Sequence, residues 1–460
     1  MTTDVSRRVF LRRASALSLT GVAAPWALNL SAIGEAAAAD ATDYKALVCV
    51  FLSGGNDYAN TLVTYDAPSH ALYTAQRPAI ATARADLAAT LLNPDVALPD
   101  GRQYALAPQL APLLPLFDQG RLAVMMNIGT LVEPVTKDRY TRGVAKLPPK
   151  LFSHNDQVSY YQSEGPEGNV TGWGGRMGDL YAAGNGNAVF TCISASGSAV
   201  FLSGDSAVAY QVSPKGSGAV AINGIKNPLF GSAACSAALR DIVTAPRSHL
   251  FEAAHAEIVR RSIDAEALLA PALPAPSKVF PAGNSLAAQL SMVARIIGAR
   301  SALGPKRQVF FVALGGFDTH DAILADHGPL LTQVAEALAA IHAATVETGV
   351  EDKVTAFTAS DFGRTLNSDG DGSDHGWGSM HFVLGGANAV NGRHLYGAAP
   401  VPANDGPDDV GRGRLIPTTS VDQFGATLAR WFGVADSELD TVFPNLHNFS
   451  SRTLPFMKFT

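Results

Sequence analysis

The chain has 460 residues, a formal net charge of −6 and only 16% charged residues. A negative balance argues against a protein that binds nucleic acid or an anionic membrane through a general positive field. The length excludes a small module and fits one large α/β domain, although length alone would suggest about two or three domains.

The N-terminal segment matches a twin-arginine export signal. Residues 6–11 read Ser-Arg-Arg-Val-Phe-Leu, residues 14–30 are mostly apolar, and the alanines at 37–39 supply a cleavage site. We therefore predict a signal peptide over residues 1–39, recognised by the twin-arginine translocase, and one α/β domain over residues 40–460. The expected location is the periplasm or the exterior. Folded cargo of this route often carries a metal or cofactor.

Later segments contain no run of 18 or more apolar residues, so we expect no membrane span after cleavage. Three cysteines are present. Cys49 lies in an apolar run and is expected to be a buried thiol, whereas Cys192 and Cys235 could pair in an oxidising compartment or stay free.

Apolar runs predict five buried strands, and helix-period segments lie between them. The strands are expected at 45–52, 122–126, 309–314, 354–358 and 381–384, and the clearest helices at 285–303 and 329–348. Fully apolar strands that alternate with helices predict a three-layer α/β/α sandwich with a largely parallel central sheet. Alternation of β-branched residues with Gly and Ser over 182–220 predicts a small antiparallel insertion, bounded at about 182–235.

Acidic and histidine residues follow the predicted strands. The carboxyl ends of parallel strands are where open α/β sheets bind ligands. These ends and the next loop carry Asp57, Asp318, His320, Asp361 and His375. Mixed carboxylate and imidazole ligands suit Zn²⁺, Mn²⁺ or Fe better than Ca²⁺, which prefers oxygen alone.

Each of these residues also has an ordinary structural interpretation. A lone aspartate in a glycine-rich turn is usually part of the turn, and a lone histidine is usually a surface or capped residue. His342, in the helix-period run after Pro329, is expected to be such a solvated side chain. The recurrence of acidic and histidine residues at consecutive strand ends is what favours a site.

The order of the strand-end motifs closely resembles that of the exported proteins grouped as domain-of-unknown-function family 1501. The motifs are Gly-Gly-Asn-Asp at 54–57, Gly-Gly-Phe-Asp-Thr-His at 315–320, Ser-Asp-Phe-Gly-Arg-Thr at 360–365 and Asp-His-Gly-Trp at 374–377. Segments 151–157, 172–176 and 411–419 also look like that family's pattern.

That family in turn resembles a distant branch of the alkaline-phosphatase and sulfatase superfamily. The resemblance implies hydrolysis of phosphate or sulfate esters with one or two metals on an α/β/α sandwich. It gives the metal-ligand roles to the five acidic and histidine residues named above, in chain order. It also implies a nucleophile at a helix start, near Ser153, where a helix N-terminus would favour an alkoxide and an incoming anion.

Two departures limit this transfer. Phe362 stands where the superfamily has a His or Asn ligand, which favours one metal, or none, over two. The sulfatase motif Cys-x-Pro-x-Arg is absent from the sequence. Ser153 can be a nucleophile or a helix N-cap. Arg364 can bind an anion or brace its loop, and either Arg364 or His154 would stabilise developing charge.

Two functions from different classes follow. The first is an exported hydrolase of small anionic phosphate- or sulfate-type esters that uses one divalent metal, Zn or Mn rather than Ca. The second is a non-catalytic exported protein that binds or assembles another exported protein on a degenerate phosphatase-like fold. The acid and histidine set favours the first function, and Phe362 favours the second.

Overall fold

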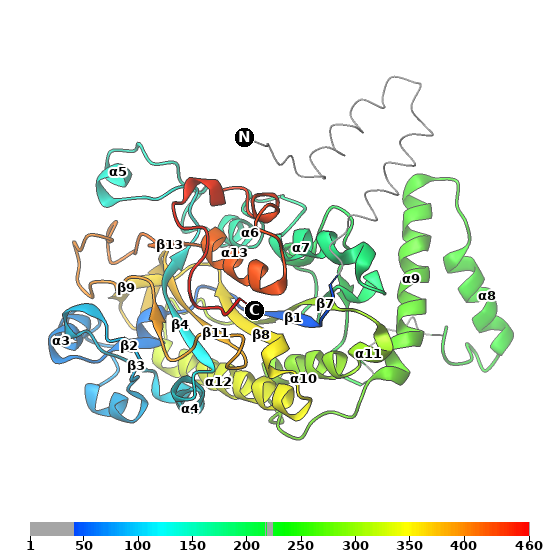
Figure 1. The fold of residues 1–460 in the computed structure, drawn as a ribbon, viewed down its shortest axis with the longest axis horizontal. Coiled ribbons are helices and arrows are strands. Elements are labelled where there is room, and N and C mark those ends of the chain that lie inside the picture. The colour runs from blue at the N-terminus through cyan, green and yellow to red at the C-terminus, as the bar shows by residue number, and fades with distance from the viewer. Residues whose placement is uncertain (1–40, 217, 219–223, 460) are drawn as a thin grey trace.

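The computed structural model describes residues 41–216, 218 and 224–459, so the predicted export signal lies outside the described residues. A nine-stranded sheet forms the centre of the molecule, and helices cover both of its faces (Figure 1). The predicted α/β class with a largely parallel central sheet and a small antiparallel part is confirmed.

The sheet has the order β12-β4-β11-β8-β1-β7-β5-β6, with β13 beside β4. Its strands are β1 (Lys45–Leu52), β4 (Leu122–Gly129), β5 (Cys192–Ser194), β6 (Tyr210–Gln211), β7 (Arg307–Leu314), β8 (Val354–Ser360), β11 (Ser379–Leu384), β12 (Leu395–Tyr396) and β13 (Thr419–Ser420). Every neighbouring pair is parallel except the two pairs that β11 makes, with β4 and with β8. All five predicted strands are present.

The helices divide between the two faces of the sheet and a projecting pair. They are α3 (Ala67–Gln76), α4 (Leu114–Asp118), α5 (Lys137–Thr141), α6 (His154–Ser163), α7 (Trp173–Tyr181), α8 (Ala233–Thr244), α9 (Leu250–Ala272), α10 (Ser285–Gly298), α11 (Arg300–Leu303), α12 (Ile323–Glu347), α13 (Val421–Phe432) and α14 (Leu439–Val442). Helices α6, α7 and α13 lie on one side of the sheet, α10 and α12 lie on the other, and α8 and α9 project from the body (Figure 1).

The central strand β1 shows why both faces need cover. Successive side chains of a strand point to opposite faces. Val48 and Val50 join the core that α10 and α12 complete, whereas Leu47 and Phe51 join the core that α7 and α13 complete. A strand that is apolar on both faces is stable only between two layers.

The region 182–220 differs from its predicted antiparallel arrangement. Strands β5 and β6 extend the main sheet and pair in parallel, β5 with β7 and β6 with β5. All three residues of β5 are buried, so this segment belongs to the sheet core. The small antiparallel sheets are instead β2 (Leu62–Thr64) with β3 (Tyr104–Leu106), and the hairpin of β9 (Arg364–Asp369) with β10 (Gly372–His375).

The cysteines and His342 were also assigned environments from the sequence. Cys49 is buried as predicted, and the three cysteines are all free. Cys192 is buried in β5 whereas Cys235 is exposed on α8, so the pairing left open by the sequence is not made. His342 is buried rather than solvated, because it lies on the face of α12 that joins the core.

Helix α12 begins before the predicted boundary and continues through Pro329. Among the described residues it is the one helix long and apolar enough to cross a membrane, by length and composition only. Its buried side chains, including Leu331, Val334 and Leu338, are part of the core beneath the sheet. Core helices commonly pass this length and composition test.

His381 of β11 is a buried histidine with an unusual environment. It is 1% exposed, it lies between the rings of Tyr161 and Phe424, and neither ring nitrogen has a hydrogen-bond partner among the described residues. Burial lowers the pKa of His381 to about 3.

We predict that His381→Phe removes an acid-dependent loss of stability. The folded-state pKa lies below the unfolded value of about 6.5, so only the unfolded state gains the proton as the pH falls through 6.5. At pH 4.5 the free energy of unfolding of the unsubstituted protein should therefore be lowered by roughly 2–3 kcal/mol, and the variant should not show this loss. Urea unfolding at pH 7.5 and 4.5 measures the difference. His255→Phe, at an exposed position of α9, is the control, and an unchanged pH dependence in His381→Phe would contradict the prediction.

Candidate metal centre

Three adjacent parallel strands end at one edge of the sheet. Leu52 of β1 lies opposite Leu314 of β7 and opposite Ser360 of β8, so the three strands end level with one another. The loop after β7 carries Asp318 and His320, and Asp361 follows β8 directly. The parallel arrangement therefore brings together residues that are far apart in the sequence.

Two further elements bring histidines to the same edge. His375 is the last residue of β10, whose hairpin with β9 folds back over the end of β8. His154 is the first residue of α6. Its Nδ1 lies 2.7 Å from Oδ2 of Asp361, although the two residues are 207 positions apart.

Three imidazoles converge on one carboxylate oxygen. Oδ1 of Asp318 lies 3.0 Å from Nε2 of His320 and 3.3 Å from Nε2 of both His154 and His375. Nε2 of His375 lies 2.9 Å from that of His320 and 3.0 Å from that of His154. Ligands about 2.0–2.2 Å from one ion lie roughly 2.9–3.4 Å from each other. The spacings among His154, His375 and Asp318 fit one coordination shell, and so do those among His320, His375 and Asp318.

The outer nitrogens of two of these histidines fix their tautomers. Nδ1 of His154 faces the Asp361 carboxylate, and Nδ1 of His375 lies 2.7 Å from the carbonyl oxygen of Phe152. Both partners only accept hydrogen bonds, so each Nδ1 carries a proton, and a ring that is neutral would present a lone pair at Nε2. Metal-binding histidines have this arrangement, with the outer nitrogen held by a carboxylate or a carbonyl.

Two lone pairs that face each other at 3.0 Å repel unless a cation lies between them. A proton could serve, and the hydrogen bond to Asp361 does raise the pKa of His154. Burial lowers the pKa of His375. A proton joins only two atoms, however, whereas His320 and Asp318 approach the same point. Among the described residues, the ligand atoms of His154, Asp318 and His375 form one group that could hold a metal ion, and those of His320, Asp374 and His375 form another.

Asp361 and Arg364 support this cluster from behind it. The other oxygen of Asp361 accepts a hydrogen bond from Gly54 N at 3.0 Å, so its carboxylate orients His154. Arg364 is fully buried and donates to Gly54 O, to Asp318 Oδ1 and to Ser373. Of the two roles that the sequence left open for Arg364, the geometry supports bracing of the loop, because no anion can reach its guanidinium.

The charge of Arg364 also acts on Asp318. Burial raises the pKa of the Asp318 carboxyl, but the hydrogen bond and the charge of Arg364 outweigh burial, and the pKa is lowered overall. Asp318 is therefore ionised at neutral pH, as a metal ligand must be.

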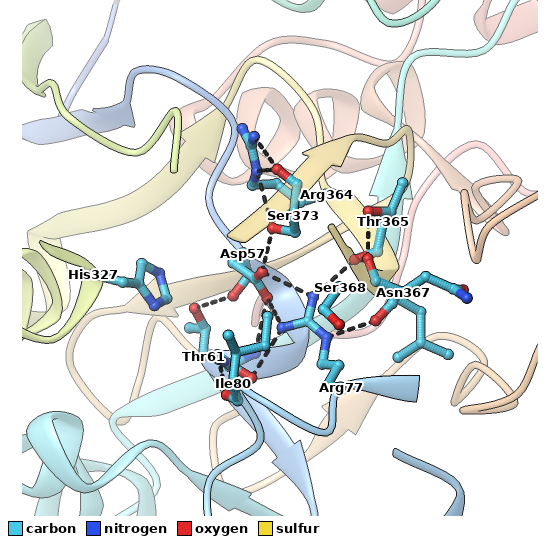
Figure 2. Close-up of polar contacts among 12 residues, drawn as sticks. Asp57, Thr61, Arg77, Ile80, His327, Arg364, Thr365, Asn367, Ser368 and Ser373 are labelled. Atoms are coloured by element: carbon cyan, nitrogen blue, oxygen red, sulfur yellow. Dashed lines mark hydrogen bonds and ion pairs between the residues drawn. The ribbon is translucent and has the colours of Figure 1, made fainter. Parts of the chain in front are cut away.

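Asp57 does not join the cluster, contrary to the expectation from the sequence. Its carboxylate is fully buried and pairs with Arg77 at 2.8 Å, and it also accepts hydrogen bonds from Asn60 N and the Ser373 hydroxyl (Figure 2). Both oxygens are thus occupied by protein donors. Asp57 is connected to the cluster only indirectly, because Ser373 also contacts Arg364. Its role in the structure is that of a buried ion pair.

Ser153 is the N-cap residue of α6 by position and immediately precedes His154. Its hydroxyl donates to Asp156 at 2.9 Å and does not cap a backbone N–H. Phe152 has a φ of +71°, which is a costly backbone conformation for a bulky residue, of order 1–3 kcal/mol. The strained residue is the one whose carbonyl holds His375.

Phe362 forms an apolar wall of the cluster. Its ring centroid lies 4.8 Å from those of both His154 and His375, and the side chain is buried. It occupies space beside the imidazoles and offers no ligand atom.

Asp374 adds a second acidic group at the rim. A carboxylate oxygen of Asp374 and ring nitrogens of His320 and His375 lie within 4.8 Å of one another. Oδ2 of Asp374 already accepts from Arg414 at 2.8 Å, and from Arg412 at 3.4 Å. These two arginines are partly exposed, unlike Arg364.

The sequence pattern missed two features of the site. It assigned His154 to charge stabilisation and did not indicate that its Nε2 lies 3.0 Å from Nε2 of His375 and 3.3 Å from Oδ1 of Asp318. The signal was present in residues 151–157, which resemble the family pattern, but nothing in that segment gives the direction of the side chain. Arg77, the partner of Asp57, lies outside every motif, so the sequence carried no signal for it.

Comparisons with known proteins give little functional information. No curated protein matches the chain. One similar solved structure is titled "Crystal structure of Ps i-CgsB in complex with k-i-k-neocarrahexaose". It is 8% identical, has a TM-score of 0.36, and the alignment covers 88% of this chain and 77% of that chain. A score this low carries no argument about this chain.

The family comparison concerns a C-terminal segment of the chain that holds most of the cluster. Residues 247–443 match the model of a family described as "Protein of unknown function (DUF1501)". The matched segment contains Asp318, His320, Asp361 and His375. This segment of the chain is therefore similar to the DUF1501 family.

Proposed function

We propose that the protein is an exported hydrolase of phosphate- or sulfate-type esters that depends on one divalent metal. The observation that carries the proposal is the pair of Nε2 lone pairs of His154 and His375, which face each other at 3.0 Å beside Asp318 and His320. The ligand shell would be these three histidines and one carboxylate, a mixed set that suits Zn²⁺ or Mn²⁺ better than Ca²⁺.

The bound metal would supply Lewis acidity that polarises an oxygen of the ester anion. Phe362 favours one metal over two, because it fills the space beside His154 and His375 without offering a ligand. Asp361 and the Phe152 carbonyl would keep the imidazoles oriented, as outer partners of metal-binding histidines do.

Positive charge near the cluster supports an anionic substrate. Arg412 and Arg414 flank His375 and are partly exposed, so their free donors can reach an anion at the rim. The free N–H groups at the start of α6 add a favourable field for an anion beside His154.

We assign the nucleophile to Ser153, because it immediately precedes His154 at the start of α6. Its hydroxyl hydrogen already points to Asp156, which is buried and would accept the proton as the oxygen attacks. Lys150 lies 3.5 Å from the other oxygen of Asp156 and forms an ion pair with it.

Hydrolysis of a panel of esters tests the proposal. Protein purified without a tag and loaded with Zn²⁺ or Mn²⁺ should hydrolyse 4-nitrophenyl phosphate, its diester or 4-nitrophenyl sulfate, and a chelator should abolish the activity reversibly. Ser153→Ala should lower kcat with bound metal unchanged. Metal-loaded protein that hydrolyses none of the three would reject the hydrolase and leave the non-catalytic binding or assembly protein.

Export is a separate part of the proposal. Arg7→Lys combined with Arg8→Lys should hold the precursor in the cytoplasm, because the translocase recognises the arginine pair itself. Cell fractionation and immunoblotting measure the outcome, and Arg12→Lys with Arg13→Lys is the matched control. Normal periplasmic accumulation of the first variant would rule out the twin-arginine route.

A further inference from the structure

A pocket of about 670 Å³ lies at the same edge of the sheet as the cluster, where β1 and β7 end. Three of its lining residues are close neighbours in the chain of cluster residues. Asn155 follows His154, Ser53 precedes Gly54, and Gly315 lies in the loop that leads to Asp318. Other lining residues follow β5, so the pocket extends from the cluster toward the β5 side of the sheet.

The lining of this pocket is polar but almost uncharged. Hydroxyl and amide groups come from Ser53, Asn155, Ser159, Gln162, Ser196 and Ser198. Among the described residues that line it, Glu167 is the only charged one, and none is cationic. The cations of this region lie instead at the cluster rim, in Arg412 and Arg414.

Two aromatic side chains that are 2% and 5% exposed contribute a small apolar surface to the same pocket. Phe51 of β1 and Phe311 of β7 both line it, and their ring centroids lie 5.9 Å apart. A surface that combines aromatic rings with hydroxyl and amide groups matches a ligand with apolar C–H faces and many hydroxyls. A lipid chain would require an apolar lining, and a second anionic group would require a cation.

Gln162 supplies an unused donor. It is 5% exposed, its side-chain carbonyl accepts a hydrogen bond from Phe201 N at 3.1 Å, and its NH₂ group has no partner among the described residues. Gln162 belongs to the face of α6 that lines the pocket, together with Asn155, Val158 and Ser159. The Gln162 Nε2 atom is not among the buried polar atoms of the described residues that lack a partner, so it keeps access to the pocket and can donate to a ligand or water there.

We propose that this pocket binds the alcohol part of the ester, and that this alcohol is a neutral, hydroxyl-rich group such as a sugar. The inference rests on the proposed hydrolase for its substrate, but the pocket and its lining are independent of the metal. The anionic group would lie at the cluster, and the sugar hydroxyls would accept from Gln162 and exchange hydrogen bonds with Asn155 and the serines. The volume is in the range of small-ligand pockets, about 300–1,000 Å³.

Two pairs of esters and one substitution test this assignment. Glucose 6-phosphate is compared with ethyl phosphate, and glucose 6-sulfate with ethyl sulfate, so each pair differs in the sugar and keeps an alkyl ester. Gln162→Glu keeps an oxygen for Phe201 N and replaces the free donor with a negative charge. It should lower kcat/KM for the sugar esters by at least about tenfold and leave the ethyl esters within about twofold. Gln119→Glu, at an exposed position after α4, is the control.

Two results would overturn the pocket assignment and leave the proposed hydrolase standing. One is an equal kcat/KM for the sugar ester and the ethyl ester of each pair. The other is an equal loss of kcat/KM for both kinds of ester in Gln162→Glu. If the protein hydrolyses no ester, the hydrolase fails and calorimetry with neutral methyl hexosides and pentosides decides the pocket. Saturable binding that Gln162→Glu weakens would support the assignment, and no binding of any glycoside would overturn it.

Discussion

His375→Ala is expected to weaken metal binding by more than about 100-fold, because even outer partners of metal ligands contribute about 10–100-fold. The substitution removes the imidazole whose Nε2 lies within 3.3 Å of His154, His320 and Asp318. Asp318→Asn should have a comparable effect, because an amide lacks the charge that offsets the cation. Elemental analysis and metal titration of each variant measure the loss.

The controls separate ligands from their supports. Asp361→Asn should weaken binding by about 10–100-fold, since Asp361 orients His154 and does not contact the proposed ion. His255→Ala, at an exposed position on α9, should change nothing. Metal binding in His375→Ala equal to that of the unsubstituted protein would contradict the proposed ligand set.

Arg77→Met is expected to lower the free energy of unfolding by about 3–5 kcal/mol, because it leaves the Asp57 carboxylate buried without its counter-charge. Both side chains of the pair are fully buried. Arg77 also donates to the carbonyl oxygens of Thr365 and Leu366, so its loss frees acceptors in β9. Figure 2 shows Arg77 beside Thr365 and Asp57. Denaturant unfolding at pH 7 measures the change.

An exposed ion pair provides the matched control. Arg142 and Asp138 lie 3.0 Å apart but are about two-thirds exposed, so Arg142→Met should cost less than about 1 kcal/mol. A similar small effect for Arg77→Met would show that the buried pair contributes little.

The stabilising effect of Asp57 should also depend on pH. Burial raises the pKa of Asp57, but Arg77 outweighs burial and the pKa is lowered overall. The contribution of Asp57 to the free energy of unfolding is therefore fully present above the pKa of the unfolded state, about 3.9. It is lost as the pH falls through the lower pKa of the folded state. The difference between Arg77→Met and the unsubstituted protein should shrink in that acidic range.

The sequence predicted the central strands and the edge at which the cluster forms. The apolar runs of β1, β7 and β8 are buried on both faces, so composition alone identifies them. Parallel neighbours end at the same edge, and this property brings Asp318, His320 and Asp361 together without any knowledge of the loops. The region 182–220 was assigned wrongly because alternation with Gly and Ser does not distinguish a short parallel edge strand from an antiparallel hairpin.

The direction of individual side chains could not be predicted. Asp57 and Asp361 both follow buried strands, yet Asp57 pairs with Arg77 and Asp361 holds His154. The difference depends on a distant arginine and a distant helix start, and each comes to the sheet edge only through tertiary packing. Sequence spacing contains no information about either approach.

The metal content of the unsubstituted protein tests the central claim most directly. Protein isolated from its exported compartment without a tag, and without added metal, should contain about one divalent ion per chain by elemental analysis, because four converging donors form one site. Protein that contains far less than one ion per chain, and that takes up none of Zn²⁺, Mn²⁺ or Ca²⁺ on dialysis, would contradict the metal centre.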